Sequence, residues 1–447
     1  MKVSKYTIPV KLEEDEYLLI NSRTGAVDLV DGEVIQLMQN PSDEADPSIT
    51  EFLTERGHIT DLSPEEELVL MEGLYKEYVK THKTYHTHVI IPTYRCNLEC
   101  SYCFLLDLQD KGKDWLNQVI DDAHIEKIFE VATEIDGQYR GRMALYGGEP
   151  LLVKNKPVVE KILKKGSDLG YAFTIPTNGV SVVDFLDILK QYSVMLQVTI
   201  DGPKEIHNTR RVKKDGTGTF DEITEGVDAA LEAGLHAILR TNLDKANVQS
   251  FPQIIDFYRR KGWIDNPNVI LHFSTVIQKP CGDYKSFTPR KTIHEALMPM
   301  KEEIPEIWQY EFDFRGMEIF ESVFLKGELG APRFWYCEAN VGMSIYDPFG
   351  DIYVCWEHVG TESTKVGKYY PELEWNDLYR AWRGRTVFEV PECKKCRYAL
   401  FCGGGCGFEA IERYGSLSKP VCYNYHEVFN MIIPNLYKTL KKQKAQK

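Results

Sequence analysis

The sequence predicts an α/β fold built on a partial (β/α)6 barrel, preceded by a small α+β segment and followed by a cysteine-rich segment. Three observations support this prediction. Strand-like and helix-like stretches alternate six times between residues 86 and 276, the first 95 residues contain no cysteine, and seven of the 11 cysteines lie between Cys337 and Cys422. With 447 residues, of which 43% are hydrophobic, the chain can form two or three domains with sizeable cores.

Composition excludes several classes of protein. The formal net charge of −14 argues against a nucleic-acid coat or a general membrane-surface binder. No stretch approaches the roughly 18 apolar residues of a membrane span, and the start, Met1 to Tyr6, lacks the apolar core of a signal peptide. We therefore expect a cytoplasmic protein with no nucleic-acid and no membrane partner. In that compartment the cysteines serve metal binding or catalysis rather than disulfides.

Residues 1–85 predict a small winged-helix-like α+β domain. A turn signal over Ser22–Gly25 separates strand-like stretches, and Ser63 followed by Glu66 forms a capping-box pattern at a helix start. We expect strands over Tyr6–Leu12, Tyr17–Asn21 and Ala26–Val30, and helices over Gly32–Gln39, Ile49–Arg56 and Ser63–Val79.

The alternation that follows predicts a parallel sheet that is closed or partly closed into a TIM-like barrel over residues 86–305. Its helices are amphipathic, as the spacing of Ile125, Ile128, Phe129 and Ala132 shows. The six strands are expected over Thr87–Pro92, Arg142–Tyr146, Tyr171–Thr177, Val194–Ile200, Ala237–Asn242 and Val269–Thr275.

Residues 306–336 are less regular and are expected to form a linker. Residues 337–440 are rich in cysteine, glycine and aromatic residues with few periodic helices, which is typical of a domain organised by metal rather than by a large apolar core. The basic tail after Lys438 is expected to fray.

Three cysteines follow the first barrel strand as Cys96-x3-Cys100-x2-Cys103. Three thiolates on a tight loop can hold three irons of a four-iron cluster and leave the fourth iron open to another ligand. A zinc site lacking a ligand, or three unrelated thiols, are the alternatives. Because ligands at the carboxyl end of a barrel strand face the usual active-site mouth, the position favours the cluster.

Glycine and polar residues follow the next four strands as well. Each of these motifs alone is compatible with a simple tight turn, but together with the cysteines they predict one functional rim. They are Gly147-Gly148-Glu149-Pro150, Thr177-Asn178-Gly179, Thr199 with Asp201-Gly202-Pro203, and Thr241-Asn242.

The pattern Cys-x3-Cys-x-aromatic-Cys, with Tyr102 as the aromatic residue, resembles that of radical S-adenosylmethionine (radical SAM) enzymes, as does Gly-Gly-Glu-Pro. The resemblance implies that the open iron binds the amino and carboxylate groups of the cofactor's methionine. It further implies cofactor contacts by Tyr102 near the adenine, by Gly147, Gly148 and Glu149 at the amine, and by Thr199 and Arg211. Arg211 could instead be a solvated loop residue, and we expect His207 to be a structural capping residue.

The later cysteines resemble the seven-cysteine SPASM pattern found after many radical SAM barrels, although Cys-x2-Cys pairs also occur in zinc ribbons. The resemblance implies three 4Fe-4S clusters, one radical SAM cluster and two auxiliary clusters. The implied auxiliary ligands are Cys393, Cys396, Cys402 and Cys422 for one cluster, and Cys337, Cys355 and Cys406 for the other. Cys281 is left over.

The sequence departs from the sulfatase maturases of this family at two points. They carry an extra cysteine shortly after the first SPASM cysteine, and none follows Cys337 here. They also place an aspartate, the catalytic base, where this chain has Trp356. One auxiliary cluster could therefore keep an open iron, which suits a substrate thiolate. Cys281 could close that site, or it could be a spare, inert thiol.

Residues 1–85 resemble the leader-peptide recognition module of peptide-modifying enzymes, which binds an extended leader at a sheet edge. Tyr17–Asn21 and Ala26–Val30 would offer that edge. The resemblance implies a maturase that installs thioether links between a cysteine sulfur and a carbon in a ribosomal precursor peptide. An electron donor such as flavodoxin or ferredoxin would serve it. Carbon–carbon cross-linking, epimerisation and sulfatase-type maturation are alternatives, and a zinc-bearing peptide-binding scaffold is the non-enzymatic one.

Overall fold

The computed structural model describes residues 1–39, 46–81, 86–276, 288–304, 307, 311–312, 323 and 329–445. The chain forms two compact units. The first comprises Met1–Thr84, Phe314–Asn340 and Gly384–Lys447, and the second comprises Tyr85–Asp313 and Val341–Arg383. The cysteine-rich segment therefore contributes to both units. In the described part of the chain, no helix is long and apolar enough to cross a membrane.

The second unit contains the expected α/β sheet. Six strands lie side by side in chain order, and every neighbouring pair among them is parallel. These strands are β6 (Thr87–Ile90), β7 (Arg142–Leu145), β8 (Ala172–Thr177), β9 (Val194–Thr199), β10 (His236–Leu243) and β11 (Val269–Thr275). All six match the predicted strands within a few residues, so the mostly parallel α/β sheet is confirmed.

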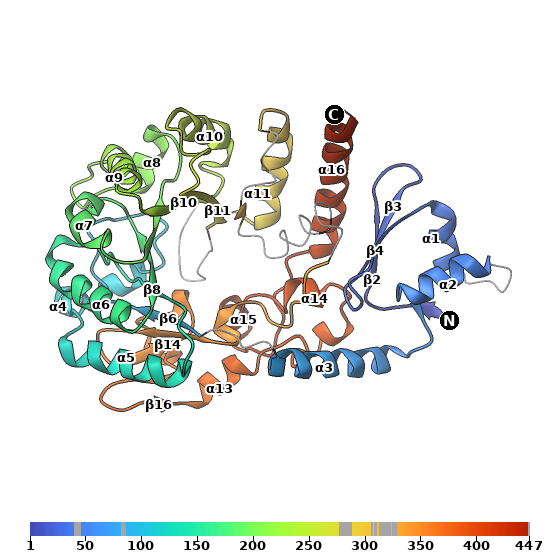
Figure 1. Cartoon of the computed structure of the whole chain (residues 1–447), viewed down its shortest axis with the longest axis horizontal. Helices are drawn as coiled ribbons and strands as arrows, with labels where there is room; N and C mark the ends of the chain where they lie inside the picture. Colours follow the sequence, from blue (N-terminus) through green and yellow to red (C-terminus); the bar gives the residue numbers. More distant parts are fainter. Residues whose placement is uncertain are drawn as a thin grey trace. The chain divides into compact units, whose positions relative to one another are not determined.

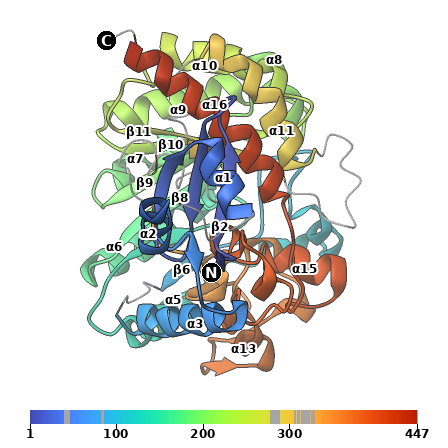
Figure 2. The ribbon, with the colours of Figure 1, turned by 90° about the vertical axis from the view of Figure 1, so that its right-hand side faces the viewer.

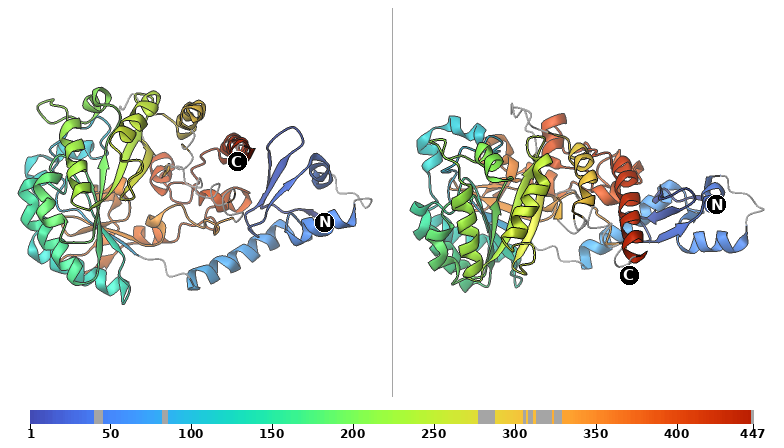
Figure 3. Two further views of the ribbon diagram at one scale, coloured as in Figure 1. Left: turned by 45° about the horizontal axis from the view of Figure 1, so that its top comes forward. Right: turned by 90° about the horizontal axis from the view of Figure 1, so that it is seen from above.

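Helices lie along the outside of this curved sheet (Figures 1 and 3). In α5 (Asp122–Asp136) the side chain of Asp121 caps the first turn by accepting a hydrogen bond from His124 N. The same helix buries Ile125 and Ile128, as its spacing predicted. The other helices of this unit are α4 (Lys113–Asn117), α6 (Lys156–Asp168), α7 (Val182–Leu189), α8 (Lys204–Arg210), α9 (Phe220–Glu232), α10 (Phe251–Arg260), α11 (Arg290–Leu297) and α13 (Asp377–Arg383).

The sheet continues beyond the predicted barrel at both edges. The short β12 (Glu311–Phe312) pairs in parallel with β11. At the other edge β13 (Met343–Tyr346) pairs in parallel with β6. Three antiparallel strands then follow, namely β14 (Asp351–Tyr353), β15 (Gly367–Lys368) and β16 (Glu374–Trp375). A piece of the cysteine-rich segment thus flanks the strand that leads into Cys96.

The first unit contains a three-stranded antiparallel sheet in the order β2-β3-β4. This sheet is drawn in dark blue in Figure 2. The strands are β2 (Thr7–Lys11), β3 (Tyr17–Asn21) and β4 (Val27–Val30), and a second small pair joins β1 (Lys2–Val3) to β5 (Ile59–Thr60). Because β3 is the central strand, the prediction that Tyr17–Asn21 offers an edge is wrong. Within the described residues, β4 does offer one.

Six helices of the first unit are α1 (Gly32–Gln39), α2 (Pro47–Glu55), α3 (Pro64–Thr81), α14 (Ala399–Cys402), α15 (Gly407–Tyr414) and α16 (Tyr425–Ala445). The capping box at α3 is confirmed, because Ser63 N donates to Glu66 and Glu66 N donates to the Ser63 hydroxyl, at 2.7 and 3.1 Å. The expected fraying after Lys438 is wrong. Helix α16 continues, and its Lys441 pairs with Glu13 and Glu16.

The N-terminal and C-terminal parts of the first unit share one hydrophobic core. Tyr6 and Met71 pack in the same buried cluster as Phe334, Val387 and Cys393. The N-terminal segment is therefore not independent of the segment that carries the later cysteines.

Candidate functional site

The loop after β6 carries Cys96, Cys100 and Cys103, and backbone hydrogen bonds hold it on two sides. On one side, Gly148 N donates to Thr93 O at 3.1 Å and Glu149 N donates to Arg95 O at 2.9 Å. On the other side, Glu99 N donates to Val212 O at 2.8 Å and Ser101 N donates to Arg210 O at 3.3 Å. The loop therefore lies between the segment after β7 and the segment after α8.

Glycine is required where the first of these segments meets the loop. A Cβ atom on Gly148 would lie 2.3 Å from the carbonyl oxygens of both Tyr94 and Arg95. A Cβ atom on Gly147, whose φ is +120°, would lie 2.6 Å from Thr93 O. The two glycines thus let the backbone before Cys96 approach the end of β7. Their contact with a methionine amine stays a prediction.

The three thiols of the loop suit an iron–sulfur cluster. Burial and Glu149 raise the pKa of Cys96 to about 12, and burial and Cys100 raise that of Cys103 to about 11. Such thiols stay protonated until a metal replaces the proton. Among the described residues, no three His, Cys, Asp or Glu side chains converge closely enough for a single metal ion. A four-iron cluster binds each thiolate to a different iron, so its ligands need not meet at one point.

Tyr102 is fixed beside these cysteines through its hydroxyl group. The hydroxyl donates to Asp201 and accepts hydrogen bonds from Arg211 Nη1 at 2.8 Å and Asn242 Nδ2 at 3.2 Å. Burial alone would raise the pKa of Asp201, but Arg210 and Arg211 outweigh it and lower that pKa. Asp201 therefore remains an anion that holds Tyr102.

Arg211 is buried, with 8% of its surface exposed, so the alternative of a solvated loop residue is wrong. Its Nε atom is buried and has no hydrogen-bond partner in the described structure. Buried donors are rarely left unpaired. The guanidinium is therefore poised to bind an anionic group such as a carboxylate, which fits the methionine carboxylate of S-adenosylmethionine.

Glu149 is buried at the ends of β7 and β8. Its carboxylate accepts hydrogen bonds from Leu151 N at 2.8 Å, and from the Thr177 hydroxyl and Asn178 N at 2.7 Å. Burial raises the pKa of Glu149, although these hydrogen bonds oppose the shift. Since an ionised carboxylate has about four acceptor sites, one remains for an ammonium group.

Two asparagines that the sequence did not single out as ligand-holding residues lie at Cys96. Asn178 Nδ2 donates to Asn97 Oδ1 at 2.7 Å and lies 3.8 Å from Cys96 Sγ. Thr199, the last residue of β9, is partly buried. His207 bridges Asp201 N and Thr219, and burial lowers its pKa to about 3, so it is a neutral structural residue as expected.

Four of the later cysteines, Cys393, Cys396, Cys402 and Cys422, belong to the first unit. Burial raises the pKa of the Cys393 thiol, and the charges of Cys402, Cys396 and Cys422 raise it further. Cys337 and Cys406 also belong to the first unit, whereas Cys355 belongs to the second. That second ligand set stays a prediction. Cys281 lies outside the described residues.

Arg385 organises the glycine run between these cysteines and was missed at the sequence level. It is 2% exposed and donates to the carbonyl oxygens of Gly404, Gly405, Leu417 and Lys419 at 2.8–3.0 Å. No spacing signal marks it, because all four of its partners are backbone atoms.

Trp356 lies in an aromatic wall of the second unit. Its ring packs edge-on against that of Tyr146, with 4.4 Å between the ring centroids, and Phe104 stacks on Tyr146 with 5.6 Å between the centroids. The side chain of Trp356 therefore lies among aromatic rings.

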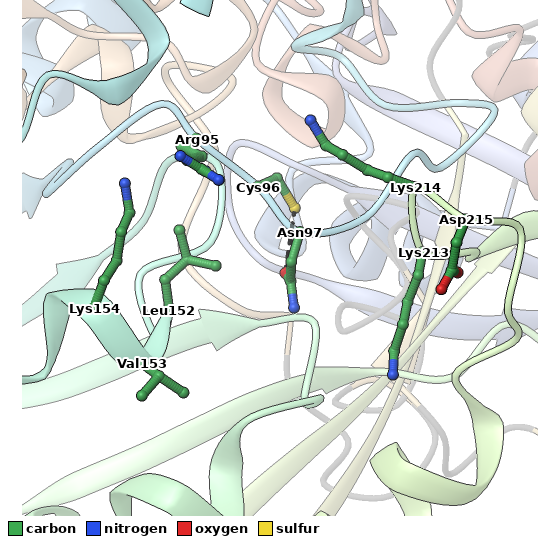
Figure 4. Close-up of a pocket in the computed structure, with 9 residues that line it drawn as sticks. All are labelled: Arg95, Cys96, Asn97, Leu152, Val153, Lys154, Lys213, Lys214 and Asp215. Carbon is green, nitrogen blue, oxygen red and sulfur yellow. Dashed lines mark hydrogen bonds between the residues drawn. The ribbon is translucent and has the colours of Figure 1, made fainter.

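A cavity of about 420 Å³ lies beside Cys96 (Figure 4), and we call it the Cys96 pocket. Tyr102, Glu149 and Arg211 do not line it. The lining residues are Arg95, Cys96, Asn97, Leu152, Val153, Lys154, Lys213, Lys214 and Asp215.

Comparison with known proteins agrees with this geometry. Residues 90–258 match the model of the radical SAM superfamily. A serine-type anaerobic sulfatase-maturating enzyme of Bacteroides thetaiotaomicron is 22% identical over 76% of this chain and 87% of its own length. The radical SAM cyclopropyl synthase TigE of Paramaledivibacter caminithermalis is 19% identical over 96% of this chain and 95% of its own.

Among solved structures, Streptococcus suis SuiB bound to its precursor peptide SuiA aligns with a TM-score of 0.56 and 16% identity, covering 94% of this chain and 98% of SuiB. SuiB has also been solved bound to S-adenosylmethionine, and that structure aligns with a TM-score of 0.54. At such identity these two likenesses establish the fold.

Proposed function

We propose that this radical SAM enzyme modifies a ribosomally made precursor peptide by joining a cysteine sulfur to a carbon of another residue. The observation that carries the proposal is the loop of Cys96, Cys100 and Cys103, held between two backbone segments beside the unpaired Nε of Arg211. The likeness over nearly the whole chain to SuiB, which binds a precursor peptide, supports the peptide substrate.

The cluster and S-adenosylmethionine, when bound, supply a 5′-deoxyadenosyl radical that removes a hydrogen atom from the peptide. Cys96, Cys100 and Cys103 would hold three irons. Arg211, whose Nε is free, would bind the methionine carboxylate, and Glu149 would accept a hydrogen bond from the methionine ammonium. Tyr102, whose hydroxyl is held by Asp201 and Arg211, would contact the adenine, and Thr199 would contribute a further contact.

Two auxiliary clusters complete the proposed cofactor set. Cys393, Cys396, Cys402 and Cys422 would hold one of them, and the SPASM resemblance implies Cys337, Cys355 and Cys406 as ligands of the other, with an iron left open. A substrate thiolate suits that iron. Trp356 argues against sulfatase-type maturation, because an indole cannot act as the base that an aspartate provides. Carbon–carbon bond formation is the second candidate, favoured by the likeness to a cyclopropyl synthase over 96% of the chain.

Mass spectrometry of the precursor peptide tests the proposal. With S-adenosylmethionine and reductant, each thioether is expected to remove two hydrogens from the peptide and to protect one cysteine from iodoacetamide. Loss of two hydrogens from a peptide whose cysteines all still react with iodoacetamide would establish carbon–carbon bonding instead. Unchanged mass with inverted stereochemistry would establish epimerisation. A peptide with its cysteines replaced by alanine is the matched control.

The free edge of β4 is the proposed leader-binding edge. Asn21 N donates to Ala26 O at 2.8 Å, and hydrogen-bonded pairs alternate along an antiparallel ladder. Leu29, which faces Leu18 in this register, therefore directs its N–H away from β3, and its side chain is 54% exposed. Leu29 can thus donate to an added strand without loss to the existing sheet.

Leu29→Pro removes that donor at an edge position where proline is tolerated. We expect the peptide to bind about fivefold more weakly, equivalent to one hydrogen bond of about 1 kcal/mol, while 5′-deoxyadenosine formation without peptide stays unchanged. Leu29→Ala, which keeps the N–H, is the control for the side chain. Equal peptide affinity of the proline and alanine variants would contradict leader binding at this edge. Deleting residues 1–85 is a poorer test, since Tyr6 and Met71 belong to a core shared with Cys393.

A further inference from the structure

We propose that the Cys96 pocket docks the acidic carrier protein that delivers electrons to the enzyme. This inference rests on the proposed function, because it concerns how the cluster held by Cys96 is reduced. It adds a location and a partner chemistry that the cofactor-binding residues do not supply.

The pocket combines an iron ligand with a rim of cations. Figure 4 shows Cys96 and Asn97 between Arg95 and Lys154 on one side and Lys213, Lys214 and Asp215 on the other. These walls come from three segments, which follow β6, β7 and α8. The first two lie directly beyond the carboxyl ends of β6 and β7, and the third follows β9 by way of α8.

The rim carries an excess of positive charge. Lys213 pairs with Glu222, and Arg95 donates to the neutral side chain of Asn117. Lys154 and Lys214 are exposed and have no carboxylate partner in the described ranges. Partial desolvation lowers the pKa of the Lys154 ammonium group, and the positive charge of the nearby Arg95 lowers it further.

Asp215 is the one carboxylate that lines the pocket, and it accepts a hydrogen bond from Thr217 N at 2.9 Å. The excess of cations is therefore not neutralised locally. On a chain with a net charge of −14, such a local excess of cations marks a place where an acidic surface is attracted.

The presence of Cys96 in the pocket lining favours an electron carrier as the occupant over S-adenosylmethionine or the leader peptide. The residues assigned to S-adenosylmethionine do not line the pocket, and the proposed leader edge lies on β4 of the other unit. A carrier docked here reaches the cluster through Cys96, and electron tunnelling weakens steeply with distance. With the cluster bound, the carrier would transfer one electron to it, and no bond or proton would change place.

The test uses the holoenzyme with flavodoxin as the acidic carrier. The variant Lys154→Glu with Lys214→Glu reverses two rim charges without altering a residue of the cysteine loop. The control, Lys190→Glu with Lys368→Glu, makes the same charge change at exposed sites. Lys190 caps α7 four residues before β9 begins, at the opposite end of that strand from the cysteine loop.

We expect the pocket variant to bind flavodoxin at least about tenfold more weakly at low salt, and to be reduced by it correspondingly more slowly, as followed by bleaching of the cluster's visible absorbance. The control variant should match the wild type in both measurements. Dithionite, which needs no docking surface, should reduce all three proteins alike and support equal 5′-deoxyadenosine formation.

Unchanged flavodoxin affinity in the pocket variant would overturn the inference. So would weaker binding of the precursor peptide with flavodoxin binding intact, because the pocket would then hold an acidic peptide. Failure of the wild type to form 5′-deoxyadenosine with dithionite would instead refute the proposed function, so the two failures are distinguishable.

Discussion

Replacing Cys100 with alanine is expected to abolish 5′-deoxyadenosine formation and to lower the iron content from about 12 to about eight atoms per chain. Cys100 is buried, and its carbonyl oxygen accepts a hydrogen bond from Cys103 N at 3.1 Å. Alanine keeps this backbone contact, so the variant removes a thiolate and little else. With two thiolates left, the loop cannot hold a cluster that presents one open iron.

Ser101→Ala is the matched control, since Ser101 is exposed on the same loop. It should retain both the iron and the reaction. Wild-type 5′-deoxyadenosine formation by the Cys100 variant would remove Cys100 from the ligand set. A colourless wild type that binds zinc would favour the peptide-binding scaffold instead. Iron analysis and chromatographic detection of 5′-deoxyadenosine supply the measurements.

The barrel was predictable because each of its strands carries a local signal. Val194–Thr199 alternates buried and half-buried residues, and the helix over Asp122–Asp136 repeats its apolar residues at helical spacing. The extension through β13 to β16 carries no such signal. Two of its strands are two residues long, and β13 pairs with β6 across more than 250 positions of sequence. Nothing local indicates that pairing.

The candidate site likewise contains residues that could be predicted from the sequence and residues that could not. Cysteines and the Gly-Gly-Glu motif were predictable because few residue types can ligate iron or allow close backbone approach. Three features could not be predicted from the sequence. They are the free Nε of Arg211, the Asn97–Asn178 pair and the four carbonyl partners of Arg385. They depend on side chains reaching atoms distant in the sequence, and hydrogen bonds to backbone atoms leave no trace in residue identity.

The close packing of Gly148 against the backbone that leads into Cys96 gives the second large prediction. Gly148→Ala is expected to cost about 1–3 kcal/mol of folding free energy, as overpacking does, and to prevent assembly of the first cluster. The new Cβ would lie 2.3 Å from the Tyr94 and Arg95 carbonyl oxygens. These atoms belong to the backbone that leads into Cys96 and cannot rotate away as a flexible side chain would.

Gly141→Ala isolates this steric effect, because Gly141 precedes the same strand, β7, and a Cβ there meets nothing within 4 Å. That control should be neutral or slightly stabilising. Thermal unfolding and iron content distinguish the two variants. A Gly148 variant as stable as the control, with all its iron, would show that the cysteine loop can shift away from β7. The hydrogen bonds from Gly148 and Glu149 would then not determine where Cys96 lies.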